Sequence, residues 1–202
     1  MSQTPRVSAD TSSAVDHLRE TLVTRRPAYQ GKLLRVYEDE VRLPDGRPAR
    51  REIVHHRGAV AIVATDSAGG IILVRQWRHA CEGALWEVPA GTRDEDEDPA
   101  VTARRELEEE TGYTAERWRP LGQACVSPGY SRELLWFFRA EGLTPGAAAT
   151  DPDELLDVRV FHPSEIGELV RAGLTDCKTL GGLALAGLLP ALVSAQSGEE
   201  VP

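Results

Sequence analysis

One stretch of the chain, Gly91–Tyr113 (GTRDEDEDPAVTARRELEEETGY), restricts the possible folds more than any other. Asp98 can cap a helix whose first residue is Pro99, because its side chain accepts hydrogen bonds from free N–H groups and proline needs no donor at that position. Gly112 can adopt the left-handed conformation that ends a helix. The stretch therefore predicts one short helix from Asp98 to Thr111.

Three acidic residues of this helix fall on one edge. With about 100° between successive residues, Glu106 and Glu110 lie about 40° apart, and Glu109 lies about 60° to the other side of Glu106. Arg105 precedes Glu109 by four residues, so these two side chains can form an ion pair. Crowded carboxylates repel one another unless a cation lies among them, and oxygen ligands suit Mg²⁺ or Mn²⁺ better than zinc. We interpret this edge as a metal site.

The neighbouring face of the helix carries Ala100, Ala103 and Leu107, which can anchor it against a sheet. A solvated face with ion pairs is the ordinary explanation for a run such as RRELEEE. However, seven fixed residues at roughly 7% usage each, together with two apolar positions, arise by chance at only about 10⁻⁹ per starting point. The spacing therefore favours a functional interpretation.

The same residues match, without a departure, the signature of the Nudix hydrolase family, G-x5-E-x7-R-E-U-x-E-E-x-G-U, in which U is apolar or aromatic. Glu97 is its first glutamate, and Leu107 and Tyr113 fill the U positions. The resemblance implies an enzyme that hydrolyses a nucleoside diphosphate linked to another group, with divalent metals held by the glutamates. It also implies an α/β fold, an α/β/α sandwich with a mixed sheet, preceded here by a small N-terminal antiparallel β subdomain.

Composition limits the partners of the chain. Its 202 residues are 41% hydrophobic and 27% charged, which is typical of one soluble globular domain with room for a small subdomain. The formal net charge of −9 argues against nucleic-acid binding, which needs a basic surface. The polar N-terminus lacks the apolar region of a signal peptide, and no apolar run is long enough to cross a bilayer. We expect no membrane association and a cytoplasmic location.

The three cysteines, Cys81, Cys125 and Cys177, are scattered along the chain. Their spacing fits neither a zinc site nor a disulfide framework. We expect reduced thiols that lie in the core or are partly buried.

The chain divides into four predicted segments: disordered ends at 1–15 and 195–202, a β subdomain at 16–57 and the hydrolase domain at 58–194. In the subdomain, Lys32–Leu43 and Arg50–His56 are predicted to form a hairpin around the turn-forming Pro44–Gly46. Further strands are predicted at 58–65, 71–75, 86–88, 118–126, 134–140 and 155–161, and further helices at 163–172 and 179–193.

Trp86–Gly91 (WEVPAG) resembles the (W)ELPAG segment of ADP-ribose pyrophosphatases. The resemblance implies that the main-chain carbonyl of Ala90 completes metal coordination, and that Glu87 supports the metals or the ribose. For Trp86, core packing is an equally good interpretation.

Ser127–Glu133 (SPGYSRE) resembles the SPG-x3-E loop of the same subfamily, in which a proline at the position of Pro128 is a marker. The resemblance makes Glu133 a candidate for the base that activates water, and Glu109 is its rival. Either carboxylate beside Mg²⁺ can orient or deprotonate a water molecule. The sequence does not choose between them.

Arg75–Arg78 (RQWR) is similar to the RQYR segment of ADP-ribose pyrophosphatases, with Trp77 in place of tyrosine. Arg78 is the predicted phosphate contact, because a guanidinium group binds phosphate oxygens bidentately. Arg75 is a second candidate for substrate binding, with a surface ion pair as the alternative. Trp77 is a candidate for contacts with the base or the ribose.

The resemblance extends from about Leu33 to Leu192 and implies Mg²⁺-dependent hydrolysis of ADP-ribose to AMP and ribose 5-phosphate. Arg105 and Glu97 then orient the metal ligands. In relatives the N-terminal subdomain exchanges contacts with a second subunit, so a homodimer is expected. Two alternatives remain open: another nucleoside diphosphate substrate (a nucleotide sugar, NADH or FAD), or a non-catalytic ligand sensor.

Overall fold

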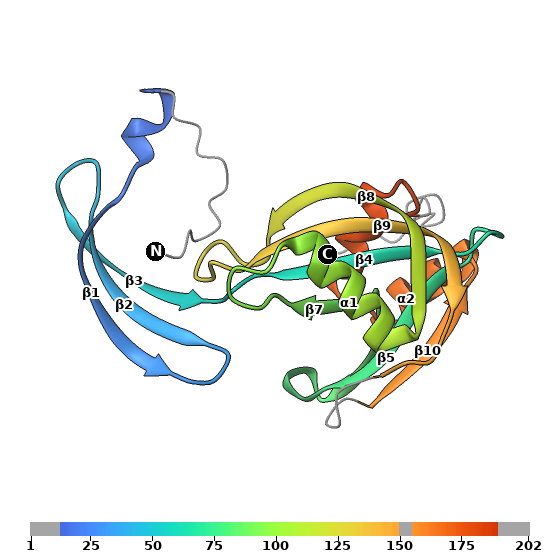
Figure 1. The fold of residues 1–202 in the computed structure, drawn as a ribbon. Coiled ribbons are helices and arrows are strands. Elements are labelled where there is room, and N and C mark those ends of the chain that lie inside the picture. Colours follow the sequence, from blue (N-terminus) through green and yellow to red (C-terminus); the bar gives the residue numbers. More distant parts are fainter. Residues whose placement is uncertain (1–12, 150–154, 190–202) are drawn as a thin grey trace. The chain divides into compact units, whose positions relative to one another are not determined.

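The computed structural model describes residues 13–149 and 155–189 of the chain. Contacts divide it into two compact units, whose helices and strands are drawn in Figure 1. The first unit comprises residues up to Ala59 together with Thr92–Asp96 and Gln123–Leu135, and the second comprises the remainder. Of the two predicted disordered ends, residues 1–12 and 195–202 lie outside the described residues.

The first unit contains the predicted antiparallel β subdomain. After a 3-10 helix at Ser13–Leu18, strands β1 (Thr21–Gln30), β2 (Arg35–Arg42) and β3 (Pro48–His55) form a sheet in the order β1-β2-β3. The hairpin of β2 and β3 follows the prediction, and Gly46 takes a positive φ of 88° in its turn. A turn of this kind favours glycine, which has no Cβ to clash.

Strand β1 was not predicted, because it lacks an alternating apolar pattern. Ion pairs to the neighbouring strand hold it instead. All ten of its residues are exposed. Arg25 forms a bidentate pair with Asp39 of β2, with distances of 2.7 and 2.6 Å. Pro27 lies beside a shift in register, which an edge strand tolerates because its outer groups need no ladder partner.

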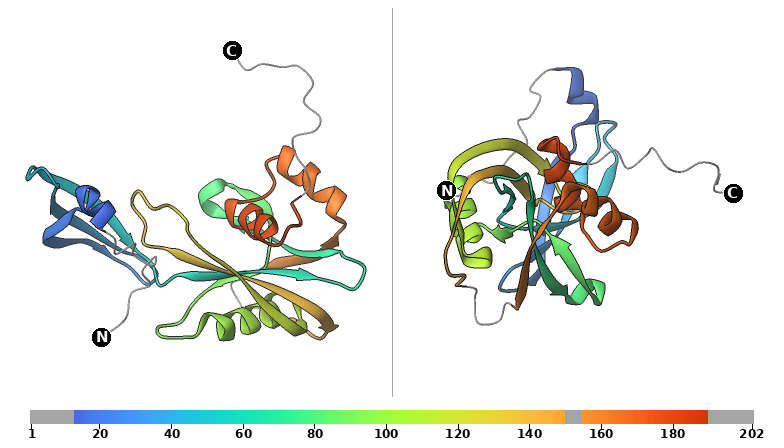
Figure 2. Two further views of the ribbon diagram at one scale, coloured as in Figure 1. Left: turned by 90° about the horizontal axis from the view of Figure 1, so that it is seen from above. Right: turned by 90° about the vertical axis from the view of Figure 1, so that its right-hand side faces the viewer.

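The second unit is built on a mixed sheet with strand order β10-β5-β4-β9-β8, in which β6 pairs with β5 and β7 pairs with β4. Helix α1 covers one face of this sheet, and helices α2 and α3 cover the other (Figure 2). The predicted α/β/α sandwich is therefore confirmed. Its elements are β4 (Ala59–Thr65), β5 (Ile71–Arg78), a 3-10 turn (His79–Cys81), β6 (Gly83–Glu87), β7 (Ala90–Thr92), α1 (Pro99–Thr111), β8 (Tyr113–Cys125), β9 (Leu134–Pro145), β10 (Leu156–Phe161), α2 (Pro163–Arg171) and α3 (Cys177–Leu185).

The predicted apolar strip anchors α1 to the sheet. Ala103 and Leu107 are fully buried in one cluster with Val60 and Ile62 of β4, and Ala100 packs at its margin. Burial of a leucine side chain contributes about 2 kcal/mol. The acidic edge of α1 is thereby fixed relative to β4 and its neighbours.

Both ends of α1 follow the prediction. Asp98 Oδ1 accepts a hydrogen bond of 2.7 Å from the N–H of Ala100, and Pro99 is the first helical residue. Gly112 has φ 73°, and its N–H donates to the carbonyl of Glu108 at 2.8 Å.

The extent of the last helix was predicted wrongly. Helix α3 ends at Leu185 instead of continuing to residue 193, because Gly187 takes a left-handed φ of 71° and the N–H of Leu188 turns back to the carbonyl of Leu183. Residues 190–193 of that prediction lie outside the described residues. None of the helices in the described part is long and apolar enough to cross a membrane.

The expectation that the cysteines are buried was also wrong. Cys81, Cys125 and Cys177 are all exposed. Each lies at the end of an element, in the 3-10 turn after β5, at the last residue of β8 and at the first residue of α3. Positions at element ends leave one side of the residue open to solvent.

Candidate active site

The acidic edge of α1 faces the short strand β7. Glu110 is only 5% exposed, and its Oε2 accepts a hydrogen bond of 3.0 Å from the N–H of Ala90. A Cβ atom placed on Gly91 would lie 1.9 Å from Cδ of Glu106. Glycine at position 91 therefore leaves room for the Glu106 carboxylate, and any side chain there would displace it.

Arg105 ties together the carboxylates at this edge. Its Nη1 lies 2.8 Å from Glu106 and 2.8 Å from Glu109, and its Nη2 lies 3.3 Å from Glu97. Burial by itself lowers the pKa of Arg105, but the hydrogen bond to Glu97 and the charge of Glu106 outweigh it and raise the pKa further above its ordinary range. Glu97 also accepts a hydrogen bond from Thr102 at 2.8 Å. Arg105 is thus a permanent cation that orients three acidic side chains.

The donors at this edge fit a hard divalent cation only in part. Within the described residues, no three His, Cys, Asp or Glu side chains stand close enough to cage a metal by themselves. The carboxylates of Glu106 and Glu110 and the carbonyl of Ala90 present oxygen atoms, which Mg²⁺ prefers to nitrogen or sulfur. Water molecules and substrate oxygens would have to complete the coordination shell, as is usual for Mg²⁺.

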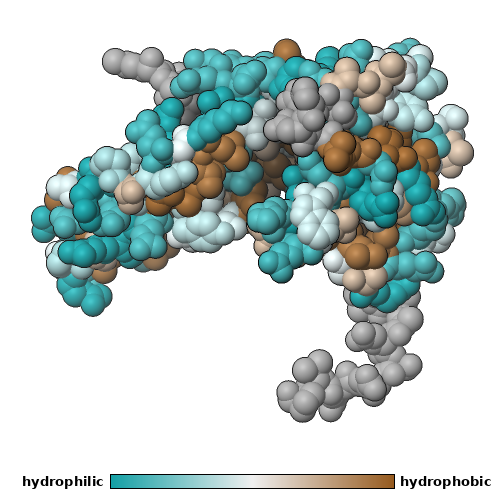
Figure 3. Space-filling model, turned by 90° about the horizontal axis from the view of Figure 1, so that it is seen from below, coloured by the Kyte–Doolittle hydropathy of each residue, from teal (hydrophilic) through white to brown (hydrophobic). Residues whose placement is uncertain are grey.

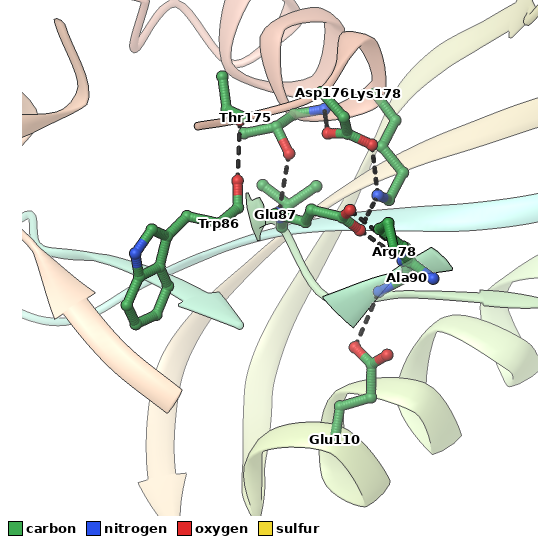
Figure 4. Close-up of polar contacts among 10 residues, drawn as sticks. Arg78, Trp86, Glu87, Ala90, Glu110, Thr175, Asp176 and Lys178 are labelled. Atoms are coloured by element: carbon green, nitrogen blue, oxygen red, sulfur yellow. Dashed lines mark hydrogen bonds and ion pairs between the residues drawn. The ribbon is translucent and has the colours of Figure 1, made fainter. Parts of the chain in front are cut away.

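A second charged cluster lies beside the acidic edge, around Glu87 at the end of β6 (Figure 4). Glu87 is 1% exposed. Arg78 donates to it from Nε at 2.8 Å and from Nη2 at 2.5 Å, and Lys178 donates to it from Nζ. Burial raises the pKa of Glu87, but the hydrogen bonds from Arg78 and the charge of Lys178 outweigh this and hold the pKa below its ordinary value. Glu87 is therefore an ionised carboxylate in the interior.

Arg78 lies within electrostatic reach of the acidic edge. Its pKa is raised chiefly by the hydrogen bond to Glu87 and further by the negative charges of Asp176 and Glu110. In Figure 4, Glu110 approaches Ala90 from α1, while Lys178 approaches Glu87 from α3. The charge of the acidic edge thus acts on the Arg78 guanidinium group.

Alternation along β5 separates Arg78 from Arg75 and Trp77. Successive side chains of a strand point to opposite faces, so residues 75 and 77 share a face that excludes 78. Arg75 pairs with Asp157 at 2.5 Å and lies over the ring of Trp86, which is itself packed edge-on against Phe161. The surface ion pair considered for Arg75 and the packing considered for Trp86 are thus both present.

Trp77 borders a cavity on that other face. Its side chain is 61% exposed. The cavity has a volume of about 420 Å³ and is lined by Arg75, Gln76, Trp77, Ala84, Leu155, Leu156 and Asp157.

In the first unit, the loop that carries Glu133 is bonded to the end of β3. The N–H of Val54 donates to the carbonyl of Tyr130 at 2.7 Å, and the N–H of Arg132 donates to the carbonyl of Val54 at 2.9 Å. Glu133 Oε1 lies 3.7 Å from Nδ1 of the buried His56. Pro128 is exposed within the turn that begins this loop. The base candidate is therefore presented by a loop with a fixed main chain.

Sequence reasoning missed Lys178 as a member of the site. One signal was available: the chain has only two lysines, and this one follows the capping residue Asp176 at the start of a helix. A cation is unfavourable at that end of a helix, so its presence indicates a nearby carboxylate.

Comparisons with known families match most of the chain to two domain models. Residues 55–176 match the NUDIX domain. Residues 20–54 match the nucleoside diphosphate sugar hydrolase N-terminal domain.

Several curated proteins resemble the chain over most of their length. It is 38% identical to the ADP-ribose pyrophosphatase of Bacillus subtilis (strain 168), over 80% of this chain and 89% of that protein. It is 37% identical to the ADP-ribose pyrophosphatase of Mycobacterium tuberculosis, over 86% and 83%, and 40% identical to the methanol dehydrogenase activator of Bacillus methanolicus, over 69% and 76%. A solved structure of an ADP compounds hydrolase has the same fold, with a TM-score of 0.73 and 22% identity over 84% of this chain and 94% of that one.

Proposed function

Because the chain belongs to the Nudix family, we propose that it is a pyrophosphatase that hydrolyses ADP-ribose to AMP and ribose 5-phosphate. The observation that carries the chemistry is the close fit of Gly91 and Ala90 against Glu106 and Glu110. Support for the substrate comes from the two ADP-ribose pyrophosphatases, which are 37% and 38% identical to the chain.

Nudix ADP-ribose pyrophosphatases generally use divalent metal ions, and we assign Mg²⁺ or Mn²⁺ to the acidic edge of α1. Glu106, Glu109, Glu110 and the carbonyl of Ala90 would hold it. When bound, such an ion neutralises charge on the diphosphate and lowers the pKa of a coordinated water molecule. Arg105 keeps Glu106 and Glu109 in place through its two bonds of 2.8 Å.

The side chains of the protein bind the substrate and move the proton. Arg78 binds an oxygen of the diphosphate, with Arg75, Trp77 and Pro128 as further candidates for substrate contacts. Glu87, which is 1% exposed, holds Arg78 and does not itself contact the substrate. Glu133 or Glu109 accepts the proton of the attacking water molecule, after which the bond between phosphorus and the bridging oxygen breaks.

A second candidate function keeps the chemistry and changes the substrate to a nucleoside diphosphate sugar. Two observations favour it: the N-terminal match to a nucleoside diphosphate sugar hydrolase domain, and 34% identity to the GDP-mannose pyrophosphatase of Salmonella arizonae, over 65% of this chain and 74% of that protein.

We also propose that the chain is a cytoplasmic homodimer, with a β subdomain at 16–57 that contacts the second copy and a hydrolase domain at 58–194. Exposed apolar side chains near the N-terminus support this proposal: Leu18 is 67% exposed, Leu22 and Val23 are each 50% exposed, and Tyr29 is 62% exposed. Figure 3 displays hydrophobic side chains among hydrophilic ones on the surface of this part of the chain. A second copy of the sheet would remove them from water.

Substitutions on α1 test the metal assignment. Glu106→Gln and Glu110→Gln should each reduce the Mg²⁺-supported rate of AMP release by about 100-fold or more, since each removes a charged ligand. Glu108→Gln is the matched control, because Glu108 is exposed on the same helix and occupies a variable position of the motif. Rates near that of the wild type for both ligand variants would refute the assignment.

A substrate panel tests the substrate. ADP-ribose, GDP-mannose, UDP-glucose, NADH and FAD are compared by chromatographic detection of the nucleoside monophosphate, with Mg²⁺ and with Mn²⁺. A higher kcat/KM for ADP-ribose than for the others supports the first candidate, and a higher value for a nucleotide sugar supports the second. Tight ligand binding without turnover would favour the sensor alternative.

A further inference from the structure

The two cations on Glu87 differ in their access to solvent. The side chain of Glu87 is 2% exposed, that of Lys178 is 16% exposed and that of Arg78 is 38% exposed. Arg78 is therefore the partner that can reach a bound ligand while Lys178 remains inside.

Lys178 is held in the first turn of α3 by two carboxylates. Its Nζ donates to Glu87 and, at 2.5 Å, to Asp176. Asp176 is the capping residue of the helix, and its side chain accepts a hydrogen bond of 3.0 Å from the N–H of Thr179. The positive end of a helix disfavours a cation, so these acidic partners account for the position of Lys178.

The residues around Lys178 fix this arrangement to β6. Thr175 donates from Oγ1 to the carbonyl of Trp86 at 2.8 Å, and the N–H of Val88 donates to Oγ1 of Thr179 at 2.9 Å. In the sequence, Glu87 lies between Trp86 and Val88, whose main-chain groups form these two bonds. The two bonds therefore hold the segment around Glu87 against the segment around Lys178.

We propose that Lys178 is a positioning residue that balances the charge of Glu87 when Arg78 turns from Glu87 to the diphosphate of the substrate. The proposal rests on the proposed function, in which Arg78 binds a phosphate group. A buried carboxylate that loses its only cation is strongly destabilised. With Lys178 present, Glu87 retains one cation while Arg78 forms charge-assisted hydrogen bonds with the ligand. Without Lys178, the diphosphate has to compete with Glu87 for Arg78.

Lys178→Met tests this role through the kinetic constants for ADP-ribose. The KM should rise at least about 10-fold while kcat stays within about threefold, because the contact of Arg78 is made in the bound substrate as well as in the transition state. Lys178→Arg keeps the charge and should restore most of the affinity. Lys32→Met is the matched control: Lys32 is the other lysine of the chain, it is exposed, and its loss changes the net charge equally.

The double variant Lys178→Met/Glu87→Gln separates charge balance from a structural role. Removal of the carboxylate charge weakens its hold on Arg78, so the KM should fall back toward that of the wild type. A double variant with a KM as high as that of Lys178→Met, or higher, would overturn the proposal. So would a fall in kcat with an unchanged KM. Thermal unfolding followed by circular dichroism confirms that the compared variants are folded at the assay temperature.

Failure of the proposed function gives a different pattern. The assignment of ADP-ribose fails if the wild type does not hydrolyse it and calorimetry with EDTA present detects no binding. The same variants are then compared on the substrate of the panel that the wild type does hydrolyse. A selective rise of KM on that substrate supports the role of Lys178. Absence of turnover and binding for every compound would overturn both proposals.

Discussion

Gly91→Ala should abolish most activity with little effect on stability. A Cβ at this position would lie 1.9 Å from Cδ, 2.0 Å from Oε1 and 2.3 Å from Oε2 of Glu106. To reach an ordinary contact of 3.4 Å, the carboxylate has to move by about 1.5 Å. A misplacement of about 1 Å at a reacting centre can reduce the rate by about 100-fold. We therefore expect AMP release to slow by at least that factor.

The free energy of unfolding should change by less than about 1 kcal/mol, because two small terms oppose each other. A side chain forced away from its preferred rotamer costs about 0.5–1.5 kcal/mol, and the obstructing atoms here belong to the flexible end of Glu106. Replacement of glycine by alanine reduces the entropy of the unfolded chain, which stabilises the fold by about 0.4–1 kcal/mol. Urea denaturation followed by circular dichroism measures the difference.

Two further variants make the assay decisive. Gly83→Ala is the matched control, since a Cβ there meets only a carbonyl oxygen at 3.6 Å, an ordinary contact. The double variant Gly91→Ala/Glu106→Gln should be no slower than Glu106→Gln alone, because both changes remove the same carboxylate from its place. The reasoning is refuted if Gly91→Ala keeps a rate within about threefold of the wild type, or if the losses of the two single variants multiply.

Three more predictions concern the base, the buried carboxylate and the assembly. The variants Glu133→Gln and Glu109→Gln show which residue is the base. The variant that removes the base should lower kcat by about 10²–10⁴-fold and lose the fall in rate at acidic pH, whereas the other should keep that fall. If both variants keep it, neither residue is the base. The pKa of Glu87 is lowered in the folded state, so its stabilising contribution is present above its ordinary pKa of 4.5 and is lost as the pH falls through the folded-state pKa. The difference in unfolding free energy between wild type and Glu87→Gln should therefore shrink on acidification, and a pH-independent difference would contradict this. Leu22→Asp should convert a dimer to a monomer in analytical ultracentrifugation, because Leu22 is 50% exposed on β1, and a monomeric wild type would rule out the homodimer.

Helix α1 and its acidic edge could be predicted because the signals that define them are local. Its cap at Asp98 and its end at Gly112 depend on neighbours within four residues. The spacing of the three glutamates determines which of them share an edge whatever the rest of the fold does. The strip of Ala103 and Leu107 likewise predicts burial from periodicity alone.

Strand β1 and the end of α3 could not be predicted in the same way. Strand β1 has no buried face, and its pairing depends on contacts such as that between Arg25 and Asp39, fourteen residues apart. Helix α3 ends at Leu185 because Gly187 adopts a left-handed conformation, although the apolar run continues past it. A glycine inside an apolar helical pattern is compatible with either outcome, so the pattern alone does not fix the boundary.

The partners of Arg78 show why the sequence predicts the residues of this site better than their roles. The sequence predicts a strand at 71–75 with Arg78 shortly after it and indicates a phosphate contact, and nothing within that segment contradicts this role. Its carboxylate partner Glu87 lies nine residues away, and the second cation on that carboxylate, Lys178, is 91 residues from Glu87. Only the folded chain brings the three together. In the proposed function, the affinity of Arg78 for phosphate therefore depends on how strongly Glu87 holds it. A motif can thus predict a binding residue, whereas the buried charges that would set its affinity are visible only in the fold.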